Sequence, residues 1–522
     1  MTTSVMNVVH LLASAVANRS RDIALVDGAN RSRRTTFGEL DLVARRMSAR
    51  LRSDGLRAGD HALLYAPPSA DLYAAMIAVW RIGAVATFVE PSAGRGVLNA
   101  ACALCSPRAF IASPKAHLLR ATSAGLRAIP RKYVVGSTLF AARRLDDATI
   151  IPDDAIAAVE GDALALLTFT SGSTGAPKGI RRTHAILHAQ LDALSDSIPS
   201  RSGERELVAL PIVVLLNIAK GVETVLPDAD LRHPAAINAN RVLEQVRALE
   251  VKKLVASPAF MERLADCPAA SVALAPIRMI VTGGGPVFPD LVQRLALLAP
   301  AAQILSVFGS TEAEPIAHIA HTEVMESDIQ AMKNGAGLLA GVPVPEVQLR
   351  LLRASSAPIT VANEHEFASW SVAAGEAGEI VVSGRHVVTH NLRGIGDAET
   401  KIHVGERVWH RTGDLARLDD TGRLWLLGRV NAASNDARGA FYPFAVECAA
   451  RLTLGVRRVA AFAREGRRVL VLQAEKATPT ANAVRTQLSW AELDDVIAVK
   501  AIPMDKRHNS KVDYPSLWRL LS

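Results

Sequence analysis

The feature that most constrains this chain is a loop-forming segment at residues 170–179, Thr-Ser-Gly-Ser-Thr-Gly-Ala-Pro-Lys-Gly, which holds three glycines, four hydroxyl side chains and one lysine. It follows residues 163–169, an apolar run typical of a buried β-strand. Glycines let backbone N–H groups approach a ligand, hydroxyls donate hydrogen bonds and Lys178 adds a positive charge, so the segment predicts a phosphate-binding loop. A P-loop does not fit, because Gly179 stands where that pattern has a magnesium-binding Ser or Thr. A flexible surface loop is the alternative, and the preceding strand argues against it.

The composition predicts a globular protein of more than one domain. The chain has 522 residues, 49% of them hydrophobic, which is enough to form more than one core. Its net charge of +8 is spread along the sequence without a dense Lys/Arg block. Nucleic acid is therefore not expected as a partner, whereas the basic excess favours an anionic substrate.

Targeting and redox signals are weak. The longest apolar stretch, residues 207–219, contains Pro211 and Asn217 and is shorter than the roughly 18 residues of a membrane-spanning helix. The start of the chain lacks the basic region of a signal peptide and only four cysteines occur, so we expect a cytoplasmic protein without a membrane span. Cys102 and Cys105 form a C-x-x-C pair in an Ala/Leu-rich segment without a second pair, which favours a buried helix over a metal or redox site.

Alternating strands and helices predict an α/β fold with doubly wound, mostly parallel sheets. Residues 61–65 and 84–89 read as strands, and residues 71–83 between them read as an amphipathic helix, which makes one βαβ unit. The alternation continues to about residue 308.

The length and hydrophobic pattern of the predicted strands change toward the C-terminus. Past residue 340 the strands become short and alternating, which predicts a small antiparallel subdomain at about 340–428. Residues 429–439 are polar and turn-rich and predict a hinge. We therefore expect a large domain at 1–428, this hinge, and a small α+β domain at 440–522.

Three predicted strands end in segments that suit a nucleotide, namely 170–179, 283–287 and 309–312. Ligands bind outside the carboxyl ends of the strands in a doubly wound sheet, so we expect these segments to form one composite site. Glu312 directly follows two hydroxyl residues, and a lone carboxylate in such a place is a natural Mg²⁺ ligand, with a solvated loop glutamate as the alternative.

Two further sets of residues leave alternatives open. Asp414, in a Thr-Gly-Asp turn, is placed to accept both hydroxyls of a ribose, but the same residues also make an ordinary turn. His184, His318 and His410 are candidates to line a site, and for each of them a structural role is the alternative.

Taken in order, these segments resemble the motifs of the adenylate-forming superfamily, which includes acyl-CoA synthetases, nonribosomal peptide adenylation domains and luciferases. The resemblance runs along nearly the whole chain. Segment 170–179 is similar to the phosphate loop of that superfamily, 283–286 to its adenine-binding glycines and 308–312 to its Tyr-Gly-x-Thr-Glu motif. The Thr-Gly-Asp turn is similar to its ribose-binding motif, and Lys511 stands where its catalytic lysine is expected.

The resemblance implies an AMP-forming ligase that uses ATP and Mg²⁺. It implies catalytic roles for Lys511, Thr311 and Glu312, with Glu312 also as the metal ligand. The residues it assigns to nucleotide binding are Thr170, Ser171, Gly172, Ser173, Thr174, Gly175, Lys178, Gly283, Gly284, Gly285, Pro286, Phe308, Gly309, Ser310, Asp414 and Arg429.

Departures from the family pattern occur at the adenine site and at the hinge, and the departure at the hinge leaves the acceptor of the second half-reaction open. Phe308 replaces the usual Tyr, and Asn431 stands where the hinge residue is usually Asp or Lys. Softer similarities, at residues 215–230, 439–442 and 503–511, are to long-chain acyl ligases and to the β-lactone synthetases of bacterial olefin biosynthesis.

Two fates of the acyl-adenylate therefore stay open for a fatty or β-hydroxy acid substrate. The acyl group is transferred to CoA or a carrier thiol, which makes CoA or a carrier protein a partner, or the acid's own hydroxyl closes a lactone without CoA. A non-catalytic nucleotide- or acyl-binding relative is the alternative of another class. The presence of both Lys178 and Lys511 argues against it.

Overall fold

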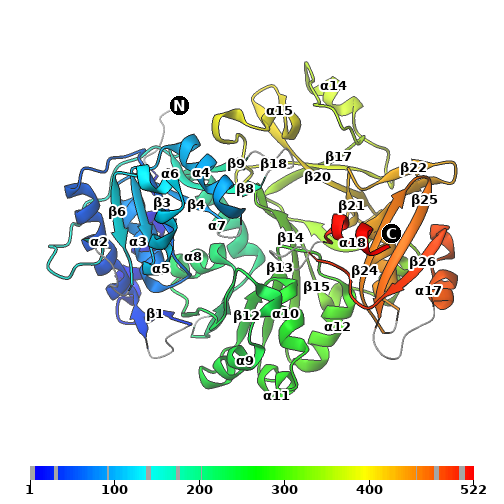
Figure 1. The fold of residues 1–522 in the computed structure, drawn as a ribbon, viewed down its shortest axis with the longest axis horizontal. Helices are drawn as coiled ribbons and strands as arrows, with labels where there is room; N and C mark the ends of the chain where they lie inside the picture. Colours follow the sequence, from blue (N-terminus) through cyan, green and yellow to red (C-terminus); the bar gives the residue numbers. More distant parts are fainter. Residues whose placement is uncertain are drawn as a thin grey trace. The chain divides into compact units, whose positions relative to one another are not determined.

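The structure is a computed structural model that describes residues 6–28, 33–90, 93–136, 143–171, 177–201, 203–453, 455–474, 481–504 and 512–521 (Figure 1). The chain forms two compact units. Unit 1 comprises Met1–Arg232, Glu244–Val255 and Arg385–Asp397, and unit 2 comprises His233–Leu243, Ala256–Gly384 and Ala398–Ser522. The predicted division into a large domain, a hinge and a small domain stays a prediction.

A seven-stranded sheet in unit 1 carries the predicted phosphate loop. Its strands follow the order β7-β6-β5-β3-β4-β8-β9 and are parallel except for the pair β8–β9. Their bounds are β3 (His61–Tyr65), β4 (Val85–Val89), β5 (Ala109–Ala112), β6 (Arg131–Val134), β7 (Arg143–Arg144), β8 (Leu164–Ser171) and β9 (Pro177–Thr183). Helices α4 (Gly94–Cys105), α5 (Pro114–His117) and α6 (Ala124–Ala128) belong to the same part of the chain.

Helix α3 (Ala70–Arg81) connects β3 to β4, as expected, but it is not amphipathic. All its residues are buried, including Asp71 and Arg81. Asp71 accepts hydrogen bonds from Arg33, and Arg81 pairs with Asp41 at 3.1 Å, so ion pairs with distant parts of the chain compensate the buried charges. Trp80 Nε1 donates to the Ala165 carbonyl at 2.8 Å and fixes α3 against strand β8.

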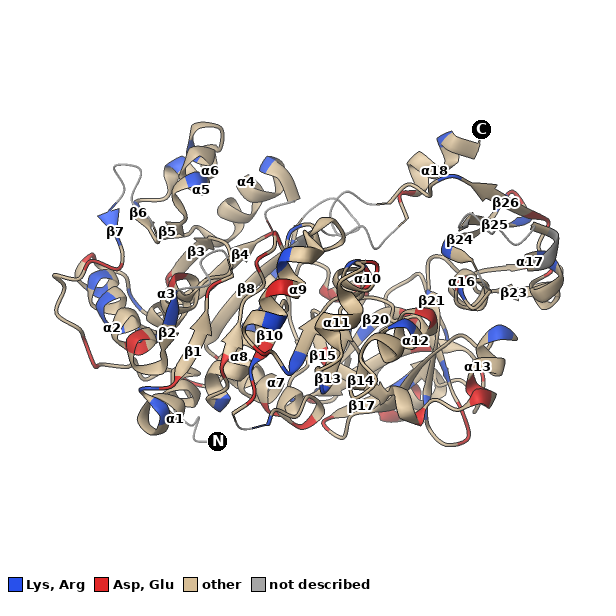
Figure 2. Ribbon diagram, turned by 90° about the horizontal axis from the view of Figure 1, so that it is seen from below, with Lys and Arg blue, Asp and Glu red and all other residues tan. Residues whose placement is uncertain are grey.

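Further strands of unit 1 follow the order β12-β10-β11-β1-β2 and are parallel except for β1–β2. These strands are β1 (Ile23–Val26), β2 (Arg34–Thr36), β10 (Glu206–Val208), β11 (Thr224–Val225) and β12 (Lys253–Ala256). Helices α1 (Val9–Arg19), α2 (Phe37–Ser53), α7 (His184–Ser197) and α8 (Pro211–Lys220) also lie in unit 1, and α9 (Ala239–Ala248) follows in the chain. Thr36 and Glu39 form the expected capping box of α2. Figure 2 shows charges of both signs on this helix. Arg50, in its last turn, pairs with Asp54, the residue after the helix, at 3.1 Å.

In unit 2, two parallel strands are followed by an antiparallel sheet, as predicted, but its antiparallel pairing begins with β15, before the predicted bound of about residue 340. Strand β13 (Met279–Gly283) is parallel to β14 (Gln303–Ser310). The antiparallel strands are β15 (Ala313–Ala320), β16 (Leu338–Pro343), β17 (Val347–Leu352), β18 (Gly378–Gly384), β19 (Lys401–Val404), β20 (Arg407–Leu418) and β21 (Leu424–Arg429). Helices in this part are α10 (Pro258–Ala265), α11 (Ala270–Leu274), α12 (Pro289–Leu298), α13 (Glu326–Lys333), α14 (Glu364–Ser369) and α15 (Asp397–Thr400).

The C-terminal part of unit 2 has a sheet and a core of its own. Strands β24 (Val456–Arg464), β25 (Arg467–Ala474) and β26 (Asp495–Val499) form the sheet, with helices α16 (Pro443–Arg451), α17 (Ala481–Gln487) and α18 (Tyr514–Leu521). Within the described ranges, no helix combines the length and the apolar character needed to cross a membrane.

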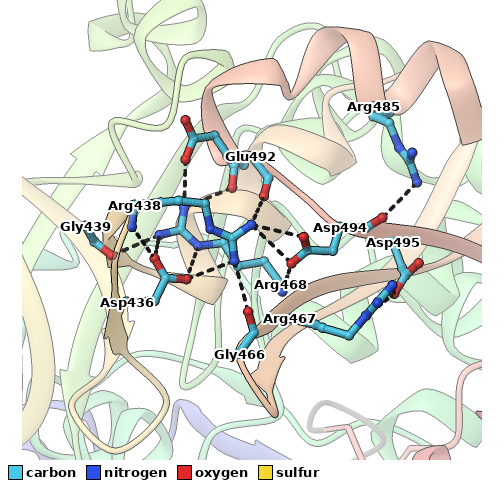
Figure 3. A network of polar contacts seen from close by, with 11 residues as sticks. Asp436, Arg438, Gly439, Gly466, Arg467, Arg468, Arg485, Glu492, Asp494 and Asp495 are labelled. Carbon is cyan, nitrogen blue, oxygen red and sulfur yellow. Dashed lines mark hydrogen bonds and ion pairs between the residues drawn. The ribbon is translucent and has the colours of Figure 1, made fainter.

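The segment after Arg429, which is predicted to be a hinge, contains regular secondary structure. Strands β22 (Ser434–Asp436) and β23 (Gly439–Phe441) form a hairpin, and Figure 3 shows how arginines fix it to β25 and β26. Arg468 donates to both carboxylate oxygens of Asp436, at 3.0 and 2.8 Å, and to the carbonyl of Gly439. Arg438 donates to Asp436 and Asp494. These hydrogen bonds, that of Arg468 first, lower the pKa of Asp436 to about 2.

Candidate functional site

The predicted phosphate loop is the connection of a β-hairpin. We expected a strand, a loop through residue 179 and then a helix. Instead, residues from Pro177 already form strand β9, which pairs with β8 in the register Thr170↔Lys178 and Ser171↔Pro177. Helix α7 begins only after Thr183, whose hydroxyl caps it. Gly172, Ser173, Thr174 and Gly175 lie outside the described residues.

Lys178 is placed by a segment that the sequence analysis did not single out. Ile180 of β9 forms a bridge with Asn391, and the chain then turns at residues 392–394. A Cβ on Gly396 would lie 2.7 Å from Lys178 Nζ, so the lysine side chain passes close to this backbone, and the φ of +80° favours glycine there. The only sequence signal for this neighbour was the spacing of Gly394 and Gly396.

The predicted adenine-binding glycines lie at the end of β13, in unit 2. Gly283 is the last residue of this strand, and Gly284 (φ +77°), Gly285 and Pro286 lead toward α12. In the parallel pair, Gly283 stands opposite Val307 of β14. The carboxyl ends of β13 and β14 therefore meet at one edge of the sheet, as predicted for two of the three strand ends.

Residues 308–312 lie where β14 turns into β15, a strand that the sequence analysis missed. Phe308 and Gly309 belong to β14, which ends at Ser310, and Thr311 and Glu312 form the turn of the hairpin. Thr311 is exposed and Glu312 is partly exposed. A carboxylate in this position is accessible to a metal ion that is brought in with phosphate oxygens.

Two hydroxyls near this edge have no hydrogen-bond partner among the described residues. Thr282 Oγ1 lies on β13 directly before the glycines, and Ser310 Oγ lies at the end of β14. A buried hydroxyl without a partner costs free energy, so both are candidates for contact with a ligand. Within the described part of the chain, no group of three or more His, Cys, Asp or Glu side chains is arranged to hold a metal ion. The residues thus fit a Mg²⁺ ion held by one carboxylate together with substrate oxygens, and not a site made by protein ligands alone.

The Thr-Gly-Asp motif lies within the long strand β20, at a register shift. Asp414 stands opposite Arg429 of β21, and the two side chains form an ion pair of 3.0 Å. Thr412 Oγ1 donates to the Ile380 carbonyl and accepts from the N–H of Asp414. Gly413 has a φ of +72°, which favours glycine, and a Cβ there would lie 2.8 Å from Arg429 Nη2, so the guanidinium passes close to this backbone. The structure therefore brings together the two residues predicted to bind the ribose.

Other candidates have structural contacts or lie outside the described residues. His184 is fully buried and its Nδ1 accepts from the N–H of Val8, and His410 Nδ1 contacts Lys401 Nζ at 3.2 Å. His318 lies on β15, opposite Val307 of β14. Lys511 lies outside the described residues.

The C-x-x-C pair has the predicted setting. Cys102 and Cys105 are free thiols, both buried on helix α4. Burial raises their pKa values to about 11 and about 12, which keeps both thiols protonated and unreactive near neutral pH.

Comparison with known proteins identifies the class to which this chain belongs. The family described as AMP-binding enzyme matches residues 12–390. The chain belongs to this family, and it is an adenylate-forming ligase.

Three relatives describe the similarity in more detail. The chain is 31% identical to an olefin β-lactone synthetase of Stenotrophomonas maltophilia, over 91% of this chain and 89% of the relative. It is 30% identical to an olefin β-lactone synthetase of Xanthomonas campestris, over 81% of this chain and 77% of the relative. An amide bond synthetase of Marinactinospora thermotolerans has the same fold, with a TM-score of 0.81 at 19% identity and coverage of 99% of this chain and 100% of that one. The predicted superfamily and fold class are confirmed.

Proposed function

We propose that this protein activates a β-hydroxy carboxylic acid as its adenylate and closes the adenylate to a β-lactone. The observation that carries the proposal is the similarity to two olefin β-lactone synthetases at 31% and 30% identity, one of them along nearly the whole of both chains. The acid, ATP and Mg²⁺ are the small molecules it requires. CoA is not needed for this reaction.

In the first step, the substrate carboxylate attacks the α-phosphorus of ATP. A carboxylate–phosphorus bond forms, the bond to the β-phosphate oxygen breaks, and pyrophosphate leaves. Bringing these anions together requires cations, which Lys178 supplies at the β- and γ-phosphates and Lys511 at the α-phosphate. Mg²⁺, held through Glu312, neutralises phosphate charge when it is bound. The other predicted residues of segment 170–179, with Thr311, hold phosphate oxygens.

The nucleoside is held by residues of unit 2. Asp414 accepts from the ribose hydroxyls and Arg429, its ion-pair partner, keeps the carboxylate oriented. The turn at residues 283–286 contacts the adenine, and Phe308 stacks on it without the hydroxyl of a tyrosine. The free hydroxyl of Ser310 supports a polar ligand at this edge of the sheet.

In the second step, the β-hydroxyl oxygen of the substrate attacks its own acyl carbon. A four-membered ring forms, the acyl–phosphate bond breaks, AMP leaves and the hydroxyl proton passes to solvent. Because nucleophile and electrophile are parts of one molecule, the enzyme has only to hold the adenylate in a folded conformation. No thiol acceptor is required, which agrees with the unusual Asn431 at the hinge.

Mass spectrometry of the products tests the proposal. A β-hydroxy acid with ATP and Mg²⁺ is expected to give a β-lactone and AMP without CoA, and an acid of equal length without the hydroxyl is expected to give only the adenylate. A thioester that forms only with CoA would instead establish thiol transfer. Absence of pyrophosphate release with any acid, while ATP still binds, would indicate a non-catalytic relative. Replacement of Lys511 by Ala is expected to slow adenylation by about 10²–10³-fold, and unchanged pyrophosphate release would exclude its role.

A further inference from the structure

Two helices flank the glycine-rich turn that is proposed to contact adenine. The turn, residues 284–288, leads directly into α12, which begins at Pro289. On its other side, a Cβ on Gly285 would lie 3.8 Å from the ring of Pro258, the first residue of α10. The turn is therefore continuous with α12 and passes close to the start of α10.

One arginine from the C-terminal part of unit 2 holds both helices. Arg451, in the last turn of α16, donates from Nε and Nη2 to the carboxylate of Asp290 in α12, at 3.1 and 2.7 Å. The same Nη2 donates to Glu262 of α10 at 2.8 Å. The Arg451 side chain is only 10% exposed, so water screens these contacts less than it screens surface ion pairs.

An aromatic pair continues this contact to the end of the turn. The Arg451 guanidinium lies 4.5 Å from the ring centre of Phe288, the residue before α12. Phe444 of α16 packs on the same ring with a centroid distance of 5.6 Å. Phe444 also fills the space beside Gly428, where a Cβ would lie 2.6 Å from Phe444 Cβ. Residues of one helix, α16, thus contact the turn and the strand that leads into the proposed hinge.

We propose that Arg451 is a positioning residue that couples docking of the small domain to the affinity for the nucleotide. While α16 is docked, its ion pairs fix α10 and α12 and hold the turn in its nucleotide-binding shape. Rotation of the small domain breaks these pairs, loosens the turn and promotes release of AMP. Because coupling is reciprocal, bound nucleotide stabilises docking by the same factor. This inference rests on the proposed nucleotide site, but not on which product is formed.

The test compares Arg451→Met with Arg464→Met. Arg464 is a matched control, because it also lies over an aromatic ring, Trp518 at 5.5 Å, but its ion-pair partner is the neighbouring Glu465. Affinity for AMP is measured by calorimetry on the full chain without an acid substrate. Docking is measured as the rate of elastase cleavage at residues 430–433, with and without AMP.

Arg451→Met is expected to weaken AMP binding by a factor between about 5 and 150, and to reduce the protection by AMP against cleavage by a similar factor. Arg464→Met is expected to change neither. In steady-state assays KM for ATP should rise more than kcat falls. Faster cleavage with unchanged AMP affinity would overturn the proposal, as would equal effects in the control.

Milder variants keep the test decisive if Arg451→Met does not fold. Asp290→Asn and Glu262→Gln each remove one ion pair of Arg451, and both are expected to weaken AMP binding in the same direction. Wild-type affinity in both would overturn the coupling. If these variants lose AMP affinity and the wild-type protein yields no product from any acid, the proposed function is refuted and this inference stands.

Discussion

Two arginines of the C-terminal part differ in what they join, although both are almost buried. Arg468 is 4% exposed, and among the described residues its side chain contacts the β22–β23 hairpin, the Ala491 carbonyl and Glu492, all beyond residue 433. Arg451 is 10% exposed and contacts two helices that lie more than 150 positions earlier in the sequence. The first arginine strengthens one body, whereas the second connects that body to another part of unit 2.

This difference indicates where the chain can bend. The hairpin is fixed to β25 and β26, so it is expected to move with the small domain. On the other side, Arg429 is held by Asp414, and the N–H of Val430 donates to the Gly413 carbonyl. Only residues 431–433 lie between these two anchored segments. A rotation of the small domain is therefore expected to be absorbed there, at the cost of the Arg451 contacts and not of the Arg468 contacts.

The largest expected effect is on stability, from replacing Arg468 by Met. The substitution leaves the carbonyls of Gly439 and Ala491 without this donor and leaves Asp436 with Arg438 alone. We expect the free energy of unfolding of the small domain to fall by about 3 kcal/mol. Urea denaturation followed by near-UV circular dichroism measures this change.

The matched control is Arg467→Met, because Arg467 is 60% exposed and its ion pair within the described part of the chain is with Asp495. Little change is expected in this variant. Equal destabilisation by the two substitutions would show that the hairpin is not held through Arg468.

The sequence predicted the candidate site most accurately where its residues lie close together in the chain. Glycines, hydroxyls and carboxylates at strand ends follow from short segments, and the parallel pair of β13 and β14 brings two of these ends to one edge of the sheet. The Asp414–Arg429 pair was predicted only through the family resemblance. Its geometry depends on the pairing of β20 with β21, which the composition of neither segment specifies.

The predictions of secondary structure that were wrong concern segments that pair with distant parts of the chain or strands with mixed polarity. Residues 177–183 contain Lys178, Arg181 and Arg182 and do not alternate as an amphipathic strand does, yet they form β9 against β8. Helix α3 contains two charges that suggested a solvent-exposed face, but Arg33 and Asp41 neutralise them inside the protein. Part of the polarity at residues 429–439 has a similar cause, since the charges of Asp436 and Arg438 serve a hairpin network and not solvent alone, while the hinge itself stays a prediction.

An intermediate effect is expected from Glu447, which lies on the same helix as Arg451, α16. Burial raises its pKa from the ordinary 4.5 to about 7, and its carboxylate accepts from the N–H of Ala461 at 2.9 Å. Because the folded state binds the proton more tightly, the stabilisation is complete below pH 4.5 and is lost as the pH rises through about 7. The loss is at most about 3 kcal/mol, and less because part of the residue is accessible to water.

Glu447→Gln is expected to flatten this pH dependence, because an amide keeps the acceptor oxygen and cannot ionise. Urea midpoints of wild type and variant, measured between pH 5 and pH 8 in about 0.5-unit steps, provide the comparison. A wild-type protein whose midpoint does not fall over this range would contradict the raised pKa.

The smallest effect is expected from Arg438→Ala, although Arg438 donates to more acceptors than Arg468 does. It contacts Asp436, Asp494 and the carbonyls of Glu492 and Gly466, but its side chain lies at the hairpin turn with 28% of its surface exposed. Water replaces these hydrogen bonds after truncation, and salt screens the ion pairs. The decrease in the urea midpoint should therefore be smaller than for Arg468→Met, and it should shrink further in high salt, whereas the effect of Arg468→Met should persist. If Arg438→Ala destabilised the small domain as much as Arg468→Met, the number of hydrogen bonds and not their burial would determine the strength of the network.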